Sequence, residues 1–335
     1  MQTHRLVPVV EETQPSTARY MARDMAGAIG FSEEDSYRVG LVATELSTNL
    51  VKHARGGEML ARPFRAGGDV GIELLAVDRG PGIRDVALAM TDGHSTAGSS
   101  GSGLGAVQRM SDTFDIHSED GRGTVVLARL MPRRRAGHAG PSLECAAVSV
   151  AMDGQPVCGD GWRVAESADR VCVAIADGLG HGLHASDAAS AALSVLEASC
   201  GEGVLPTLEA MHLAARHTRG AAAAIVSWQT GQQVLMAGGV GNIATTIVDG
   251  SGVVRHAVSH PGTLGHQART FRDYSYPWSD DSLLVMHSDG LATHWSFDGM
   301  PGLRRRHPAV VAAVLYREFS RRRDDVTVLV ARERR

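Results

Sequence analysis

The stretch that decides the fold is Pro132-Arg-Arg-Arg-Ala-Gly-His-Ala-Gly-Pro141. It has no apolar periodicity, it carries three consecutive arginines, and prolines bound it with small residues between them. Such a sequence buries almost nothing, and Pro and Gly interrupt regular structure, so it is typical of a linker. Motifs suited to a nucleotide precede it, and motifs suited to a metal follow it. The stretch therefore predicts a domain at 1–131, a linker at 132–141 and a second domain at 142–335.

Composition is that of two ordinary domains. The chain has 335 residues, of which 43% are hydrophobic and 21% charged, and one domain takes roughly 100–200 residues. A net charge of -4 predicts no general attraction to nucleic acid or to an anionic membrane. No apolar run approaches the roughly 18 residues that a membrane span needs, and the N-terminus lacks the apolar core of a signal peptide. We expect a cytoplasmic protein with no nucleic-acid or membrane partner, and the sequence leaves its oligomeric state open.

Two helices are expected near the N-terminus, at 15–30 and 35–54. In the second, apolar residues recur at three- and four-residue spacing from Val39 to Leu50. Another face of the same helix carries Glu45, Asn49 and His53, each one turn from the next. A carboxylate one turn from a carboxamide presents two oxygens to one Mg²⁺ or to its water shell. A solvated helix face is the simpler interpretation of these residues taken alone.

Glycine-rich segments after this helix suit a nucleotide. The strand expected at 70–77 ends in Asp78-Arg-Gly80-Pro-Gly82, and a carboxylate there can accept a hydrogen bond from an amine such as that of adenine. Gly101-Ser-Gly103-Leu104-Gly105 opens the helix expected at 104–112, and glycines before a helix leave amide groups free for phosphate. Gly123-Thr124 precedes the strand expected at 125–130. A Rossmann interpretation fails, because no buried strand precedes the glycines and no acidic residue follows about twenty positions later.

In this order the segments resemble the GHKL superfamily of Bergerat-fold ATPases and kinases. Glu45–Asn49 resembles its N box, Asp78–Gly82 its adenine loop, Gly101–Gly105 its phosphate loop and Gly123-Thr124 its last box. The short first half, which has no histidine-phosphorylation helix, resembles the anti-sigma-factor serine kinases, and the runs Asp92–Thr96 and Gly103–Asp112 are similar to the RsbT type. This resemblance implies an N-terminal α/β sandwich in which Asn49 holds Mg²⁺ and Glu45 is the base for the acceptor hydroxyl. The implied ATP-binding residues are Asn49, Asp78, Gly80, Gly82, Gly101, Gly103, Leu104, Gly105 and Thr124.

Carboxylates stand next to several expected strands of the second half. Asp177 and Asp289 each follow a strand, Asp324 and Asp325 precede one, and Cys158–Trp162 is expected to be a turn that carries Asp160. Since the end of one antiparallel strand lies beside the start of the next, these side chains should meet at one rim. Hard cations such as Mg²⁺ or Mn²⁺ relieve their repulsion, and a two-metal site activates water and clamps a phosphoryl group. For any single Asp-Gly pair, an ordinary turn is the alternative.

The carboxylate set resembles the PPM-type metal-dependent Ser/Thr phosphatases of the SpoIIE and RsbX branch. The segments that carry the resemblance are Gly159-Asp160, Asp177–Gly182, Gly239–Ile243, Gly262–Gly265, Ser288–Gly290 and Asp324–Thr327. The resemblance implies an αββα sandwich, which makes the whole chain α+β. It further implies that Asp177 is the central catalytic ligand and bridges the metals, and that the other ligands are Asp160, the Gly178 carbonyl, Asp289 and Asp324. His181 either protonates the leaving group or caps its own loop.

Together the two resemblances imply a fused kinase and phosphatase that uses ATP, Mg²⁺ and Mn²⁺. Its expected substrate is a STAS-domain anti-sigma antagonist protein in bacterial partner switching, and a sigma factor or another switch protein is a further candidate partner. Two alternatives stay open. The first half can be an ATP sensor for the phosphatase, or it can be an anti-sigma binding module without kinase activity.

Overall fold

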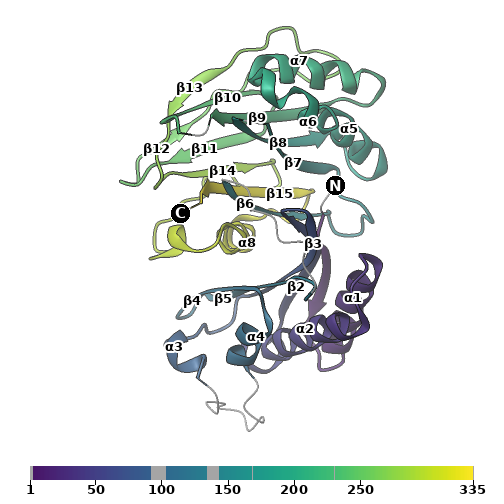
Figure 1. Ribbon diagram of the computed structural model, residues 1–335, viewed down its shortest axis with the longest axis vertical. Coiled ribbons are helices and arrows are strands. Elements are labelled where there is room, and N and C mark those ends of the chain that lie inside the picture. The colour runs from purple at the N-terminus through teal and green to yellow at the C-terminus, as the bar shows by residue number, and fades with distance from the viewer. Residues whose placement is uncertain (1–2, 92–102, 134–142, 168, 230, 335) are drawn as a thin grey trace. The chain divides into compact units, whose positions relative to one another are not determined.

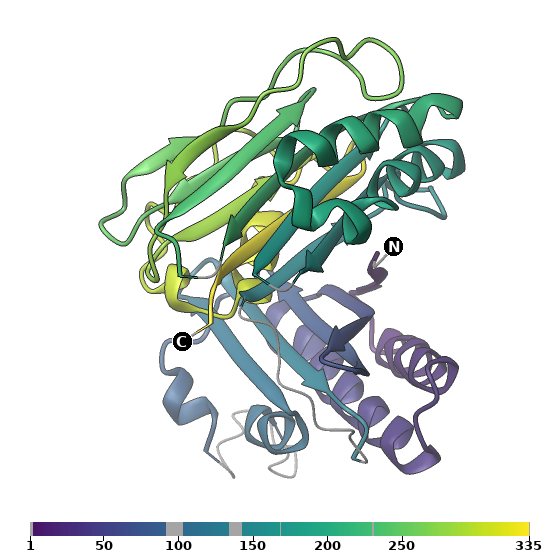
Figure 2. The ribbon, with the colours of Figure 1, turned by 45° about the horizontal axis from the view of Figure 1, so that its top comes forward.

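The computed structural model describes residues 3–91, 103–133, 143–167, 169–229 and 231–334. They divide into two units, whose elements are drawn in Figure 1 and Figure 2. The N-terminal unit comprises residues 4–140 and 297–317, and the C-terminal unit comprises residues 1–3, 141–296 and 318–335. Most of the expected linker lies outside the described residues, as do Asp92–Thr96 and Gly101 of the expected nucleotide motifs. No helix in the described ranges is long and apolar enough to cross a membrane.

An antiparallel sheet is the frame of the N-terminal unit. Its strand order is β1 (Arg5–Val9), β2 (Gly57–Ala66), β3 (Asp69–Asp78), β5 (Gly123–Leu130) and β4 (Thr113–Glu119). One face packs against α1 (Gln14–Ala28), α2 (Glu33–Ala54) and α4 (Leu104–Met110), and the short helix α3 (Val86–Ala89) follows β3 (Figure 1). Alternate residues of β3, such as Ile72 and Leu74, join the apolar side chains of α2 in one core. This is the sandwich that the sequence predicts.

The helix boundaries differ slightly from those that the apolar periodicity predicts. α2 begins at Glu33 rather than at residue 35, because Ser32 is its N-cap and accepts a hydrogen bond from the amide of Asp35 over 3.1 Å. α1 ends at Ala28, shortly before Gly30 takes a positive φ of 88°. α4 ends at Met110 rather than at residue 112.

The second face of the N-terminal sheet is also buried. Between Ile72 and Val77, β3 is covered on both faces, and its Glu73 is 0% exposed. The segment 297–317 reaches this face, and it contains most of α8 (Pro308–Phe319). Figure 1 shows α8 on the opposite side of the sheet from α1 and α2. A segment that lies between two motifs of the second set in sequence, Ser288–Gly290 and Asp324–Thr327, is therefore part of the N-terminal unit.

Two antiparallel sheets build the C-terminal unit. The first has the order β13 (Tyr274–Pro277), β10 (Val234–Val240), β9 (Ala221–Gln229), β8 (Arg170–Gly178) and β7 (Asp160–Glu166). The second has the order β12 (Val254–His256), β11 (Ala244–Val248), β14 (Leu283–His287), β15 (Val326–Glu333) and β6 (Leu143–Val150). Side chains from both sheets share one core. Helices α5 (Leu183–Leu193), α6 (Leu196–Ser199) and α7 (Val204–Ala214) cover the outer face of the first sheet.

Three local expectations in the C-terminal unit are wrong. The expected turn at Cys158–Trp162 instead leads into β7, so Asp160 is the first residue of a strand. The alanine-rich sequence of 185–199 predicts one helix, but the structure has two, since α5 ends at Leu193 and α6 starts at Leu196. The glycines of Gly238–Asn242 predict a turn, but β10 continues through Val240, so Gly238 and Gly239 lie in the strand.

Candidate functional site

Asp160 and Asp177 face each other across the β7–β8 ladder. They are a directly opposed pair in the register of the two strands, and opposed Cβ atoms in antiparallel strands are about 4.5–5.5 Å apart. Asp160 is almost completely buried, at 1% exposed. Two carboxylates so placed repel each other unless a proton or a cation lies between them.

The electrostatics extend this pair to a larger cluster. Burial raises the pKa of Asp177 to about 9, and the rise is increased by the carboxylates of Asp160, Asp289, Asp324 and Asp325. Burial likewise raises the pKa of Asp160 to about 7, against the hydrogen bond from Ser288. The pKa of Asp289 is raised by burial and then by Asp324. These carboxylates therefore interact through charge at one edge, in the direction that antiparallel pairing of the strands predicts.

Two residues between and beside the carboxylates hold them in place. The hydroxyl of Ser288 donates to Oδ2 of Asp160 over 2.6 Å and accepts from the amide of Thr327 over 3.0 Å. The side-chain amide of Asn242 donates to Oδ2 of Asp289 over 2.7 Å. Sequence reasoning placed Asn242 in a motif but gave it no role, because nothing in a Gly-Val-Gly-Asn run shows which strand end it will meet.

Asp324 and Asp325 are adjacent in sequence but differ in environment. Asp325 is 3% exposed, and its oxygens accept hydrogen bonds from the amides of Met152 and Gly159, each over 2.8 Å. Asp324 is exposed and accepts from the amide of Asp325 over 2.9 Å. Asp324 is therefore the member of the pair whose carboxylate faces solvent.

The donor set fits a hard divalent cation in chemistry. Several carboxylates lie at this edge, Gly178 directly follows Asp177, and oxygen ligands are those that Mg²⁺ and Mn²⁺ prefer. Among the described residues, no three His, Cys, Asp or Glu side chains are already gathered closely enough to form a finished ligand shell.

The loop after Asp177 is tightly packed and carries an arginine at its edge. A Cβ on Gly178 would lie 1.9 Å from the main-chain oxygen of Ala185, so only glycine fits there. The amide of Leu179 donates to the oxygen of Gly220 over 2.9 Å. Arg219 is exposed, and its Nη1 lies 3.1 Å from the point where a Cβ on Gly180 would stand. Sequence reasoning missed Arg219, since a single arginine before an expected strand carries no motif.

Asp78 is the centre of the expected nucleotide site in the N-terminal unit. It ends β3 and is 8% exposed. Its Oδ1 accepts hydrogen bonds from the amides of Gly80 over 2.8 Å and Thr124 over 3.1 Å. No described residue donates to its Oδ2, which is therefore available to an amine. Gly82 has a φ of 74°, and a Cβ there would lie 2.0 Å from the oxygen of Glu119, so the loop passes where a side chain cannot.

The remaining expected nucleotide residues lie on α2 and at the start of α4. Glu45 and Asn49 are half-buried on α2. Gly103 precedes α4, and Leu104 and Gly105 are its first residues. Thr124 shares a hydrogen bond of 2.8 Å between its hydroxyl and that of Ser118. The adenine-loop and last-box residues thus meet at Asp78, whereas Gly101 lies outside the described residues.

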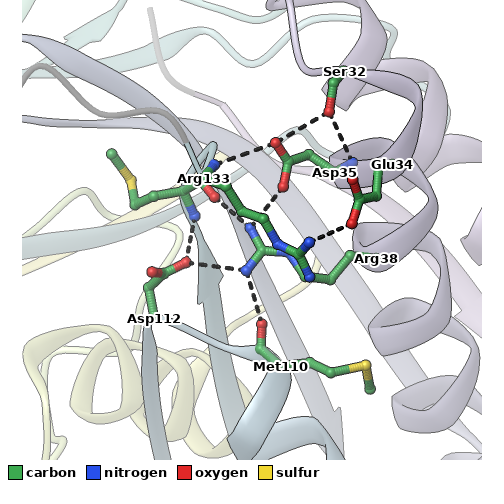
Figure 3. A network of polar contacts seen from close by, with 8 residues as sticks. Ser32, Glu34, Asp35, Arg38, Met110, Asp112 and Arg133 are labelled. Carbon is green, nitrogen blue, oxygen red and sulfur yellow. Dashed lines mark hydrogen bonds and ion pairs between the residues drawn. The ribbon is translucent and has the colours of Figure 1, made fainter.

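A polar network fixes α2 against the ends of α4 and β5 (Figure 3). The guanidinium of Arg38 donates to the main-chain oxygen of Met110 over 3.3 Å and also to that of Met131. It forms ion pairs with Asp35 and Asp112 at 3.2 and 3.7 Å. Since α2 also carries Glu45 and Asn49, this network helps to hold in place the helix that presents both side chains.

The fold and these sites define a class of protein, with a histidine kinase-like ATPase domain followed by a PP2C-type phosphatase domain. Residues 9–130 match the family model described as "Histidine kinase-like ATPase domain", and residues 167–334 match "Stage II sporulation protein E (SpoIIE)". The chain belongs to the SpoIIE family, and its N-terminal part is RsbT-like.

Relatives of each half are separate proteins in Bacillus subtilis (strain 168). "Serine/threonine-protein kinase RsbT" is 34% identical over 128 residues, which cover 38% of this chain and 96% of RsbT. "Phosphoserine phosphatase RsbX" is 26% identical over 139 residues, which cover 42% of this chain and 70% of RsbX. The expected resemblance to both types is confirmed.

Solved structures agree with the fold of the second half. A structure from "The bacterial stressosome: a modular system that has been adapted to control secondary messenger signaling" has a TM-score of 0.53 and 29% identity, and the match covers 57% of this chain and all of that one. RsbX in complex with magnesium has a TM-score of 0.51 and 21% identity, over 59% of this chain and 98% of that one. The latter likeness shows the fold.

Proposed function

We propose that this protein both phosphorylates and dephosphorylates serine or threonine in a STAS-domain anti-sigma antagonist protein. The observation that carries the proposal is the convergence of Asp160, Asp177, Asp289 and Asp324 at one rim, in a chain that also presents Asp78 to a nucleotide. The similarity to RsbT and to RsbX, one in each half, supports opposite reactions on one phosphorylated residue. Because the kinase reaction consumes ATP, the compartment that we propose is the cytoplasm.

The phosphatase half would hold two Mg²⁺ or Mn²⁺ ions. Asp177 would be their central ligand, and the other ligands would be Asp160, the Gly178 carbonyl, Asp289 and Asp324. When bound, such ions supply an activated water and a clamp for the phosphoryl group. Ser288 orients Asp160 through its 2.6 Å hydrogen bond. Arg219, exposed beside the loop after Asp177, is placed to meet the oxygens of a substrate phosphate, which a guanidinium binds in a bidentate way.

The kinase half would hold Mg·ATP between α2, the Asp78 loop and the start of α4. Oδ2 of Asp78 would accept a hydrogen bond from the adenine amine, while Gly80 and Thr124 keep Oδ1 in place. Asn49 would contribute to the Mg²⁺ shell, and Glu45 would accept the proton of the attacking hydroxyl. Phosphoryl transfer needs little beyond such positioning, a metal and a base.

Two other functions of the N-terminal unit make different predictions. An ATP sensor binds ATP and alters phosphatase activity without labelling any protein. An anti-sigma binding module holds a sigma factor or another switch protein, also without labelling. Transfer of labelled phosphate to a STAS-domain protein separates the proposed kinase from both.

The test of the phosphatase half uses the full chain and a phosphorylated STAS-domain protein. We expect the partner to lose its phosphate when Mn²⁺ or Mg²⁺ is present and to keep it in excess chelator. Mass spectrometry measures the phosphorylated fraction. Full activity in chelator contradicts the metal proposal. Activity on a free phosphate ester without any on STAS-domain proteins contradicts the substrate proposal alone.

A further inference from the structure

A buried arginine from the end of the sequence contacts the expected adenine residue. Nη1 of Arg317 donates a hydrogen bond of 3.1 Å to the main-chain oxygen of Asp78. Arg317 is 2% exposed and Asp78 is 8% exposed. Both belong to the N-terminal unit, although 239 positions separate them. The contact lies where β3 ends and the adenine loop begins.

The segment that carries Arg317 is anchored at several points of the same sheet. The hydroxyl of Tyr316 donates to Oε2 of Glu58 on β2 over 3.0 Å. The amide of His307 donates to Oδ2 of Asp115 on β4 over 2.7 Å. Nη1 of Arg122 donates to the oxygen of Gly299 over 2.9 Å. These contacts span the sheet from β2 to β4, so Arg317 is held by more than its own hydrogen bond.

Asp78 is thereby fixed on both its side chain and its main chain. The amides of Gly80 and Thr124 hold its Oδ1, and Arg317 holds its carbonyl oxygen. Burial raises the pKa of Asp78, and the charge of Arg317 opposes that rise. An acceptor for an amine must be both ionised and fixed in direction, and Arg317 serves both requirements.

We propose that Arg317 is a positioning residue for adenine recognition, so that the nucleotide site is built from residues 4–140 and completed by residues 297–317. The inference rests on the proposed role of Asp78 as the adenine acceptor. It implies that the nucleotide-binding unit is incomplete in any fragment that ends at the linker. Arg317 itself touches no nucleotide and acts through Asp78.

The test measures the dissociation constants of Mg·ATP and Mg·ITP by calorimetry on the full chain. ITP carries an oxygen in place of the adenine amine, so the ratio of the two constants reports on the Asp78 contact. We expect Arg317→Met to raise the dissociation constant of Mg·ATP by about 10-fold, the scale of one lost hydrogen bond to a charged group. The dissociation constant of Mg·ITP should change little, so the preference for ATP over ITP should be largely lost. Arg317→Lys keeps the charge and a donor, and it should restore part of the ratio.

Two control variants come from the same segment. Arg305→Met removes an exposed guanidinium, and Tyr316→Phe removes the anchor to Glu58 next to Arg317. Both should keep the wild-type ratio. A wild-type ratio in Arg317→Met overturns the inference. So does a result in which Arg317→Met and Tyr316→Phe each weaken the binding of ATP and of ITP by the same factor.

If Arg317→Met does not fold, Arg317→Gln replaces it, because glutamine also removes the charge, and a wild-type ratio in that variant overturns the inference. If the unmodified chain shows no preference for ATP over ITP, the role of Asp78 fails and the inference falls with it. A clear preference that is unaffected by Arg317 overturns the inference alone.

Discussion

Oδ2 of Asp325 accepts a hydrogen bond of 2.8 Å from the amide of Gly159. The other oxygen of Asp325 accepts from the amide of Met152 over the same distance. This carboxylate therefore ties the start of β15 to the segment that leads into β7, and through it fixes the position of Asp160. Asp324, one residue earlier, is exposed and has no comparable structural role among the described contacts.

The adjacent pair should separate structure from metal binding. We expect Asp324→Asn to lower Mn²⁺ affinity with little change in thermal stability, because its carboxylate faces solvent. Asp325→Ala should lower stability by about 1–3 kcal/mol per buried amide left without its acceptor. Calorimetric titration with Mn²⁺ and thermal unfolding of both variants check this. Equal losses of metal affinity at unchanged stability would show that Asp325 is itself a ligand.

Arg219 should affect substrate binding rather than metal binding. Arg219→Ala should raise KM for a phosphoserine peptide by about 10-fold or more, the scale of a charge-assisted hydrogen bond to phosphate. Its Mn²⁺ affinity should stay at the wild-type value. Arg216→Ala, an exposed arginine on the same connection, is the matched control. A wild-type KM in Arg219→Ala contradicts the proposed phosphate contact.

Glu73 should be a large contributor to the stability of the N-terminal unit. Its carboxylate is 0% exposed and pairs with Nε of Arg62 at 2.6 Å and Nη2 of Arg129 at 2.7 Å. Burial alone would raise the pKa of Glu73, but the charges of the two arginines outweigh it and hold the pKa well below 4.5. Glu73→Gln removes the buried carboxylate that both guanidinium groups contact, so we expect a loss of stability of about 3–5 kcal/mol.

The loss of stability in Glu73→Gln should become smaller as the pH falls. Since the folded pKa is depressed, the stabilisation by Glu73 is fully present above the unfolded value near 4.5 and disappears as pH falls through the folded pKa. Thermal unfolding of both proteins at pH 7 and at lower pH measures it. The exposed Glu33→Gln is the control, with an expected change of less than about 0.5 kcal/mol. A stability difference between Glu73→Gln and the wild type that grows as the pH falls contradicts the depressed pKa of Glu73.

The local motifs could be predicted from the sequence because the residues of each motif lie within a few positions of one another. Asp177 is the penultimate residue of β8, which is buried along most of its length, and the opposed Asp160 follows from antiparallel pairing once β7 is recognised. β7 was missed because Gly159 and Gly161 flank Asp160, and glycines favour a turn when a sequence is read alone. The break after α5 was missed because an alanine-rich run shows no helix end.

Contacts between distant segments could not be predicted in the same way. Nothing in residues 297–317 indicates that they pack on β2–β5, because three consecutive arginines at 304–306 are typical of a solvated turn. Arg306 is indeed exposed, but it also pairs with Asp115 at 3.2 Å. One signal was present: Ile72–Val77 is apolar at nearly every position, which is typical of a strand covered on both faces.

The two reactions on one chain are tested most directly with two variants and one STAS-domain partner. The chain with Asp177→Asn, given Mg·ATP, should drive the partner towards the phosphorylated form, because only the phosphatase is lost. The chain with Glu45→Ala should remove phosphate from the phosphorylated partner and should add it on the order of 10²-fold more slowly than wild type. The measurement is the phosphorylated fraction of the partner, followed by mass spectrometry. An unlabelled partner with the Asp177→Asn chain, although that chain binds ATP, would contradict the kinase half of the account.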